Sequence, residues 1–380
     1  MNFKQKSTRA GVTTGLLATV LVAFLGACSS TDKPKPATLA ANTPQIAVSQ
    51  AWTARVGPQA TGLQPVVSGR VVTVAGADGT VAALEAATGR DIWRSNVKGA
   101  IAAGPGSDGR IAAVVTQGNE VVALNGGSEI WREKISSQVF TPPFVAGGRV
   151  FVLAADRSVA AFDGQSGRLL WRQQRPGEPL VLKQPGVMLA VGDTLVVGLS
   201  GRLAGLDPLN GTVRWEAPIA TPRGINDVER LVDLVGRTAR KDGVVCARAF
   251  QASVGCVNAD RGSLLWTKPA NGYDGLDGDG TLVFGTESDG KVVAWQARDG
   301  ERAWTSDRLQ YRGLTAPVLL GRSIAVGDNT GLVHFIARED GALLNRLPTD
   351  GSAVAATPVL ADGTLIVVTR NGGIFGFRPE

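Results

Sequence analysis

The chain has 380 residues, of which 44% are hydrophobic and 19% are charged, enough to bury one large core or two ordinary ones. Glycine supplies 49 residues, nearly twice average usage, so the chain turns often and a bundle of long helices is excluded. A single histidine and three cysteines exclude most zinc enzymes, multi-cysteine metal clusters and haem attachment. The net charge is +6, and no cluster of Lys or Arg stands out after the N-terminal segment, which argues against nucleic-acid binding.

The N-terminus is predicted to be an export signal. Residues 1–27 combine Lys4, Lys6 and Arg9 with a short apolar stretch and end in small residues, the pattern of a secretory signal peptide. The apolar stretch is shorter than the ~20 residues that a membrane span needs. The segment Leu-Gly-Ala-Cys resembles a bacterial lipobox, which predicts that Cys28 is lipidated and becomes the first mature residue. An uncleaved anchor with an incidental cysteine is the alternative.

The mature chain is predicted to begin with a flexible tether. Residues 28–45 are small, polar and proline-rich, a composition typical of linkers. Serine follows the cysteine where aspartate would be a retention signal, which in the enterobacterial sorting pattern implies the outer membrane. We therefore expect a protein anchored by lipid in the outer membrane and facing the periplasm, with its folded domain over residues 46–380.

A repeat of about 40 residues organises that domain. A glycine followed four residues later by a tryptophan occurs six times, and a seventh copy, Gly341/Asn345, keeps the glycine and loses the tryptophan. Successive glycines lie 38, 40, 44, 51, 38 and 41 residues apart. The six complete pairs are Gly89/Trp93, Gly127/Trp131, Gly167/Trp171, Gly211/Trp215, Gly262/Trp266 and Gly300/Trp304.

Each repeat has the pattern of four short antiparallel strands. In the third unit, β-prone runs between residues 144 and 171 are separated by turn residues, and four strands per ~40 residues is typical of a β-propeller blade. Residues 357–378 supply only three strands of an eighth unit. Trp52, at the other end, stands 41 residues before Trp93, in register with the repeat. The prediction is an all-β, eight-bladed propeller, closed by an N-terminal strand that completes the last blade.

The chain lacks the residues of a catalytic centre. The repeated tryptophans are interpreted as packing between blades, because function rarely needs a rotationally repeated residue. His334 lies in a strand-like run and is interpreted as packed rather than as a base. Asp274, Asp277 and Asp279 faintly resemble a calcium loop, but no closing glutamate follows at the right distance, so the run is interpreted as a turn between blades. We expect no enzyme activity, no metal and no cofactor.

Cys246 and Cys256 are predicted to face each other across a hairpin. The two β-prone runs that contain them surround a turn near Gln251, midway between the cysteines. In an oxidising periplasm this arrangement favours a structural disulfide. A pair of buried free thiols is the alternative.

The repeat resembles two families of propellers. The segment 83–93, Ala-Leu-Glu-Ala-Ala-Thr-Gly-Arg-Asp-Ile-Trp, is similar to the repeat of quinoprotein dehydrogenases and equally to that of the outer-membrane assembly factor BamB family, lipoproteins of the BAM complex. Quinoprotein dehydrogenases are normally much longer and carry an adjacent pair of cysteines, which this chain lacks. The resemblance to the BamB family extends from Cys28 to Glu380.

Two stretches sharpen this resemblance. Residues 179–183, Pro-Leu-Val-Leu-Lys, resemble the Leu-x-Leu-Arg loop of the family, and residues 224–235 resemble its acidic-Arg-Leu-x-Asp segment. In the family these loops lie close together and bind the periplasmic POTRA domains of BamA. The resemblance therefore implies a partner-binding surface made by Leu180, Leu182, Lys183, Glu229, Arg230 and Asp233. Lys183 replaces an arginine and loses its bidentate fork, and Val235 stands where the family often has a second aspartate.

The function implied by the resemblance is a non-enzymatic scaffold. Its expected partners are BamA, the other BAM lipoproteins and unfolded outer-membrane proteins, whose folding and insertion it would aid. The two longest repeat spacings, 44 and 51, bracket both stretches, and extra length between blades forms loops on one rim. Solvated insertions are the alternative for the loops. An adaptor for another envelope complex, or a quinoprotein-like dehydrogenase, is the alternative for the chain.

Overall fold

The computed structural model describes residues 1–3, 34–175, 180–223, 225–227 and 230–380. The expected signal peptide beyond residue 3, and Cys28, lie outside the described residues. The chain divides into two units, Met1–Lys35 and Pro36–Glu380, and every described strand belongs to the second. Among the described residues, none forms a helix of the length and apolarity that crossing a membrane requires.

The described strands form eight antiparallel sheets of four strands, the blades of a propeller. Blades 1 to 4 consist of β2 Val66–Ser68, β3 Val71–Ala75, β4 Thr80–Glu85 and β5 Asp91–Asn96; β6 Ile101–Ser107, β7 Ile111–Thr116, β8 Glu120–Asn125 and β9 Ser128–Lys134; β10 Phe144–Ala146, β11 Arg149–Leu153, β12 Ser158–Asp163 and β13 Leu169–Gln174; β14 Met188–Val191, β15 Thr194–Leu199, β16 Arg202–Leu206 and β17 Val213–Pro218.

Blades 5 to 8 follow the same order, except that the last takes one strand from the other end of the chain. They consist of β18 Leu234–Lys241, β19 Val244–Ala249, β20 Ser253–Asn258 and β21 Ser263–Pro269; β22 Leu276–Gly278, β23 Leu282–Thr286, β24 Val292–Gln296 and β25 Arg302–Ser306; β26 Val318–Leu320, β27 Ser323–Gly327, β28 Leu332–Ala337 and β29 Leu343–Pro348; β30 Val359–Ala361, β31 Thr364–Val368, β32 Gly373–Pro379 and β1 Val48–Arg55.

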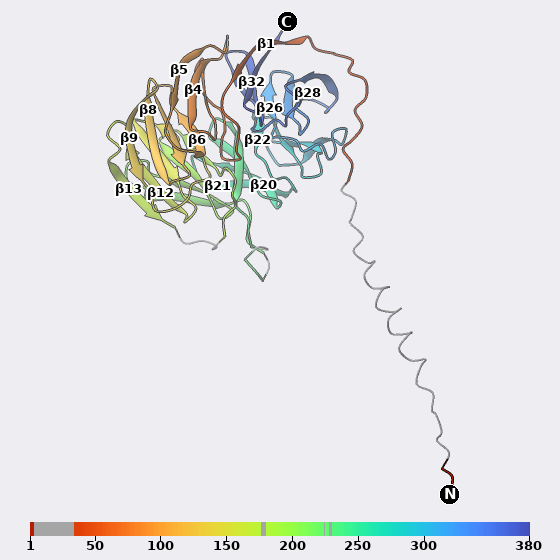
Figure 1. Ribbon diagram of the computed structural model, residues 1–380, viewed down its shortest axis with the longest axis horizontal. Helices are drawn as coiled ribbons and strands as arrows, with labels where there is room; N and C mark the ends of the chain where they lie inside the picture. Colours follow the sequence, from red (N-terminus) through yellow and green to blue (C-terminus); the bar gives the residue numbers. More distant parts are fainter. Residues whose placement is uncertain (4–33, 176–179, 224, 228–229) are drawn as a thin grey trace. The chain divides into compact units, whose positions relative to one another are not determined.

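The ring is closed between the two ends of the chain. Strand β1 pairs with β32 in antiparallel register, from Val48 opposite Pro379 to Arg55 opposite Gly373. Figure 1 shows the two strands side by side, with the C-terminus next to them. The inner strand β30 of blade 8 also contacts the inner strand β2 of blade 1. The predicted eight blades and the predicted closing strand are both confirmed.

The core lies between neighbouring blades. The second and third strands of a blade are apolar runs covered on both faces; in β7 all six residues are buried. Outer strands alternate, as in β13, where Trp171 is buried and its neighbours along the strand are not. A sheet packed on both faces needs continuous apolar sequence, whereas an outer strand keeps one face in water.

The repeated tryptophans join each blade to the next. Trp52 of blade 8 packs on Gly89 in the outer turn of blade 1, where any side chain would collide with the indole ring. Its Nε1 donates a hydrogen bond of 3.0 Å to the carbonyl of Ala86 in the same turn. Four further tryptophans donate in the same way over 2.8–3.0 Å, namely Trp131, Trp171, Trp266 and Trp304. The interpretation of these residues as packing is confirmed.

The missing tryptophan of blade 7 has a structural reason. Blade 8 has no outer turn at this point, since its two outer strands come from opposite ends of the chain. The segment before β1 fills that place, and Asn345 of β29 donates a hydrogen bond of 2.9 Å from Nδ2 to the carbonyl of Ile46. The side chain of Asn345 therefore donates the hydrogen bond that the indole N–H donates in other blades, and its acceptor is the segment before β1 instead of an outer turn.

Residues 37–45 form a strap along blade 7, which corrects the expected boundary between tether and propeller. Gln45 N–H donates to the carbonyl of Leu344 over 2.7 Å, and Asn42 Nδ2 donates to the carbonyl of Arg346 over 3.0 Å. At its start, the N–H of Ala37 donates to Gln310 over 2.9 Å. The packed unit therefore begins at Pro36 rather than at residue 46. Composition could not reveal this, because a polar, proline-rich segment satisfies its backbone equally well in water or on a surface.

A buried polar network stabilises blade 7 beneath the strap. Asp328 is fully buried and accepts hydrogen bonds from Arg312 Nε at 2.8 Å and from the N–H of Leu332 at 3.0 Å. His334 Nε2 lies 2.9 Å from the same carboxylate, inside β28. Arg312 Nη1 also donates to the carbonyl of Ala37, over 3.2 Å. His334 is thus a packed residue, as predicted, and the network links the blade to the strap.

We expect the stability of the propeller to fall between pH 7.5 and pH 5.5 because of His334. Burial, followed by nearby Arg312 and Arg346, lowers the pKa of His334 below its ordinary value of 6.5 despite the bond to Asp328. As the pH falls through about 6.5, His334 is protonated in the unfolded chain but stays neutral in the folded chain. The free energy of unfolding is therefore unaffected above that pH and decreases below it, by up to about 1.4 kcal/mol per pH unit. Thermal unfolding of the wild type and of His334→Gln across this range measures the effect. The same slope in both proteins would contradict it.

Two other sequence motifs are structural. Cys246 of β19 lies opposite Cys256 of β20 with a Cα–Cα distance of 3.9 Å, and the structure joins them in a disulfide. The carboxylates of Asp274 and Asp277 each accept a backbone N–H of blade 7 at 2.9 Å, and Asp279 accepts Arg338 Nη1 at 2.9 Å. The aspartate run therefore ties blade 6 to blade 7. It was predicted to be a turn between blades, but Asp277 lies in β22, the first strand of blade 6, with Asp274 before it and Asp279 after it.

Candidate partner-binding surface

Two long connections lie next to each other on one side of the propeller. The first loop joins β13 to β14 and is described from residue 180 to 187; the second joins β17 to β18 and is described over 219–223, 225–227 and 230–233. Their ends pair as an antiparallel bridge at Gly186 and Val235, and the N–H of Gly236 donates to Pro185 over 2.8 Å. The loops that the resemblance brings together are therefore adjacent.

Asp233 connects the two loops through its side chain. Its Oδ2 accepts the backbone N–H of Leu182 over 2.9 Å, so the second loop holds the backbone of the first. Its own carbonyl accepts the N–H of Phe250 over 3.0 Å, which fixes Asp233 to blade 5. Because its carboxylate is occupied in this way, Asp233 shapes the surface rather than presenting a charge to a partner.

Arg157 completes this connection, and sequence reasoning missed it. It lies in the turn between β11 and β12 of blade 3, and its side chain is 8% exposed. Its Nη1 donates to Asp233 Oδ1 over 3.1 Å, and its Nη2 donates to the carbonyl of Leu180 over 2.8 Å. A signal was present in the sequence, since most other blades carry glycine at this place in the turn.

The apolar side chains of the two loops are partly open to solvent. Leu180 is 41% exposed and Ile225 of the second loop is 99% exposed, whereas Leu182 is half-buried. Leu182 borders a small cavity of about 50 Å³ between the loops, with Arg157 and Asp233 among its lining residues. Ile225 was not among the predicted site residues, although it lies in the predicted stretch. Exposed apolar side chains gathered on one loop pair are a feature of docking sites.

The remaining predicted residues lie around this pair. Lys183 is exposed and lines a separate hollow of about 430 Å³ with Gln117, Asn119 and Gln138. Arg230 is half-buried in the second loop, and Glu229 lies outside the described residues. Val235, where the family often has a second aspartate, is buried at the start of blade 5 and does not belong to the exposed surface.

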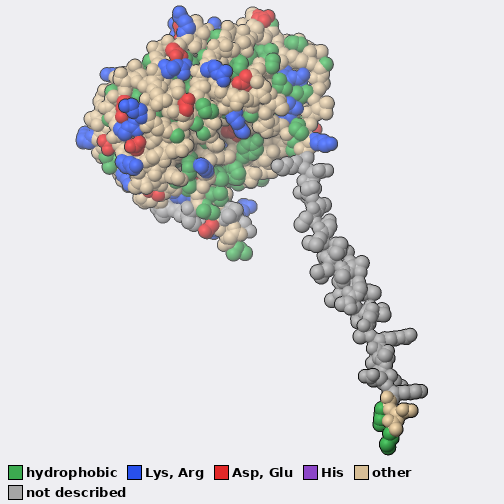
Figure 2. Space-filling view, in the orientation of Figure 1, with side chains coloured by type: hydrophobic (Ala, Val, Ile, Leu, Met, Phe, Trp, Pro, Cys, Tyr) green, Lys and Arg blue, Asp and Glu red, His purple; other side chains and the backbone are tan. Residues whose placement is uncertain are grey.

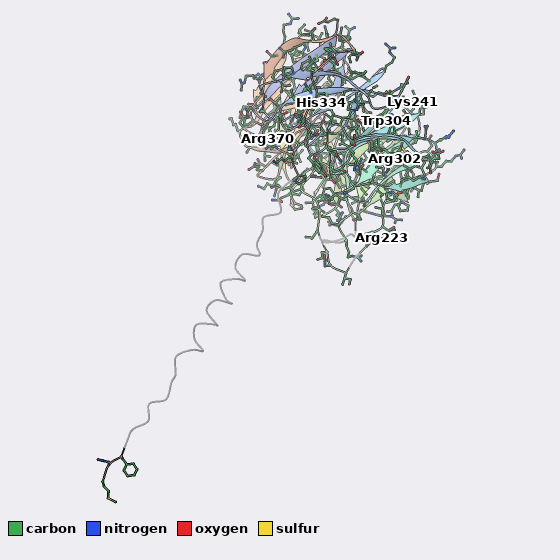
Figure 3. The ribbon with its side chains drawn as sticks, turned by 90° about the vertical axis from the view of Figure 1, so that its right-hand side faces the viewer. Arg223, Lys241, Arg302, Trp304, His334 and Arg370 are labelled. Atoms are coloured by element: carbon green, nitrogen blue, oxygen red, sulfur yellow. A yellow bond between two sulfur atoms is a disulfide. The ribbon has the colours of Figure 1, made fainter. Side chains whose placement is uncertain are left out.

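A groove opens beside the second loop. It has a volume of about 710 Å³, and its lining includes Ile219, Val232 and Arg223 of the second loop together with Phe250 and Lys268 of blade 5. Arg223 lies on the part of the chain that projects from the propeller (Figure 3). Elsewhere on the face in Figure 2, basic and acidic side chains are interspersed without a field of one sign. Within the described part of the chain, His, Cys, Asp and Glu do not gather into a group of three that could hold a metal ion.

Comparison with solved structures defines the class of protein. BamB from Moraxella catarrhalis superposes with a TM-score of 0.79 at 24% identity, over 87% of this chain and 99% of that one. The quinohemoprotein alcohol dehydrogenase from Comamonas testosteroni superposes with a TM-score of 0.66 at 14% identity, over 89% of this chain and 79% of that one. At such identities the likeness concerns the fold alone. The chain is an eight-bladed propeller of PQQ-like repeats.

Sequence comparison gives the family. The model of the family described as outer membrane protein assembly factor BamB matches residues 45–99 and 77–306. The protein of that name from Burkholderia pseudomallei is 38% identical over 96% of both chains, and the one from Bordetella pertussis is 36% identical over 97% of this chain and 96% of that one. The chain belongs to the BamB family of outer membrane protein assembly factors.

Proposed function

We propose that this chain is a non-enzymatic scaffold of the outer-membrane β-barrel assembly machinery. It is held in the outer membrane by lipidated Cys28 and faces the periplasm. It docks on the POTRA domains of BamA through the two-loop surface, formed by the described residues of the first and second loops. There it works beside the other lipoproteins of the machinery and aids the folding and insertion of outer-membrane proteins.

The observation that carries this proposal is the joining of the two loops by Asp233. Family membership supports the general role, since the relatives bear the name of outer membrane protein assembly factors. The carboxylate of Asp233 fixes the backbone at Leu182, and the two adjacent loops that it joins carry the exposed side chains of Leu180 and Ile225. An apolar anchor with a polar surround is the arrangement that concentrates binding energy in a protein interface.

We expect Leu180→Asp to weaken the binding of BamA by about 30-fold, or about 2 kcal/mol, because a central apolar anchor is replaced by a charge. The full-length lipidated protein is purified from detergent-solubilised outer membranes and the co-purifying BamA is quantified. Affinity for purified BamA of the same organism is then measured for each variant.

A matched control is Leu209→Asp. Leu209 is 64% exposed in the turn between β16 and β17, outside the two loops, so this variant should bind as the wild type does. Unchanged binding by Leu180→Asp would reject the assigned surface. Absence of BamA from a folded, lipidated wild-type preparation would reject the function.

A further inference from the structure

The turn before the third strand of a blade requires a left-handed backbone. Glycine occupies this position of the turn in five blades, with φ of 95° at Gly79, 77° at Gly201, 83° at Gly290, 77° at Gly331 and 81° at Gly372. Blade 2 has Asn119 there, with φ of 58°. Asparagine is the side chain that tolerates this conformation best after glycine.

Blade 3 departs from this rule with Arg157, at φ of 63°, and blade 5 has Gln251, at φ of 47°, in the same turn. A long side chain gains nothing from the left-handed conformation and adds strain to the turn. It is also costly to bury a guanidinium, yet this one is 8% exposed. Both costs are offset if the side chain is needed, and two of its hydrogen bonds reach Asp233 in one loop and Leu180 in the other.

We infer that Arg157 is the positioning residue of the two-loop surface, an inference that rests on the proposed function. Its planar fork holds the carboxylate of Asp233 and the carbonyl of Leu180 at once, which fixes the two loops before the partner arrives. A surface ordered in advance loses less conformational freedom on binding. Arg157 touches the partner through neither bond; it acts through Leu180 and Asp233.

The test replaces Arg157 with glycine, the residue that the same turn carries in five other blades. Two quantities are measured on the full-length chain. The first is hydrogen exchange at the Leu182 amide, whose N–H donates a hydrogen bond to Asp233 in the wild type, and the second is the Kd for purified BamA. We expect exchange at Leu182 to be about tenfold faster or more, and Kd to rise about tenfold, since the loop must then be ordered on binding.

Three further variants keep the test sharp. Asp362→Gly removes a left-handed side chain (φ of 48°) from the turn between β30 and β31 of blade 8, outside both loops, and should leave both quantities at wild-type values. Arg157→Lys keeps the charge but cannot donate from two guanidinium nitrogens at once. Its exchange rate at Leu182 and its Kd should therefore lie between those of Arg157→Gly and the wild type. In the double variant Arg157→Gly with Asp233→Asn, the second change should add little, because both residues order the same loop.

The outcomes separate the two proposals. Wild-type exchange at Leu182 in Arg157→Gly would overturn the positioning role, whatever the affinity for BamA. Faster exchange with an unchanged Kd would also overturn it, because docking would not depend on the ordered loop. Failure of the wild type to bind BamA would instead reject the proposed function, and would be seen before any variant is compared.

Discussion

A chain that begins at residue 57 is expected to lose the cooperative unfolding of the propeller. It lacks β1, so β32 keeps an unpaired edge and blade 8 has three strands. It also lacks Trp52, which packs on Gly89 and Gly376 and donates to Ala86, so the contact between blades 8 and 1 is opened. Truncation of a fully buried tryptophan costs about 3–5 kcal/mol, and the half-buried Trp52 contributes part of this, against a total stability of typically about 5–15 kcal/mol.

Circular dichroism melts and size-exclusion chromatography with light scattering measure this effect. The expected result is a broad or absent thermal transition together with self-association, because an exposed strand edge pairs with other chains. A chain that begins at residue 47 is the matched control. It loses the strap and keeps β1, so it should remain monomeric with a cooperative transition. A sharp transition near the wild-type Tm for the shorter chain would contradict the closing role of β1.

Asp328→Ala is expected to destabilise the protein by about 3–5 kcal/mol. The carboxylate is fully buried and accepts bonds from Arg312, Leu332 and the Thr330 N–H and hydroxyl, all within 3.0 Å. Its removal leaves the Arg312 guanidinium, 9% exposed, without its anion. Breaking a buried pair from one side costs this much because the remaining charge stays desolvated. Chemical denaturation at pH 7 measures the change in free energy of unfolding.

The control for this substitution is Asp78→Ala in blade 1. Asp78 lies in the matching turn and accepts the N–H of Thr80 over 3.0 Å, but it is exposed. We expect a cost below about 1 kcal/mol there, because water replaces the lost acceptor. Similar costs for the two substitutions would show that the buried network adds nothing to the turn itself. Burial raises the pKa of Asp328, but the hydrogen bonds that it accepts, that of His334 first among them, outweigh burial and hold this pKa well below its usual range. Its contribution to the free energy of unfolding therefore persists at neutral pH and is lost only below about pH 4.

The ring could be predicted from the sequence because its determinants are local and repeated. Blades 1 to 7 each carry their own glycine turn, and six of them carry a tryptophan after it, so seven copies reinforce one interpretation. Trp52 extended the register to the N-terminus, and β1 lies where that register places it. The sequence alone could not explain why asparagine replaces tryptophan at Asn345. The cause is the segment before β1, which takes the place of an outer turn in blade 8 and lies nearly 300 residues away along the chain.

The candidate surface was predicted only in part. The resemblance selected the two loops, which are adjacent, but it could not assign which side chains face a partner and which hold the loops. Asp233 binds the Leu182 backbone and Arg157, a pairing 76 residues apart in sequence that no local pattern encodes. Arg157 itself was detectable only by comparing equivalent turns among the blades of this chain, where it departs from glycine.

The strap also determines where traction on the N-terminal end of the folded unit is borne. A pull at Pro36 first loads the bonds of Ala37 with Gln310 and Arg312, and then those of Asn42 and Gln45 with β29. These contacts lie on blade 7 and the connection that leads into it. The hydrogen bonds between β1 and β32 carry no tension until the strap has detached from blade 7. Strand β1 is the first strand of the chain and also the strand that closes blade 8. The strap thereby protects the closure of the ring from a force applied at the N-terminal end.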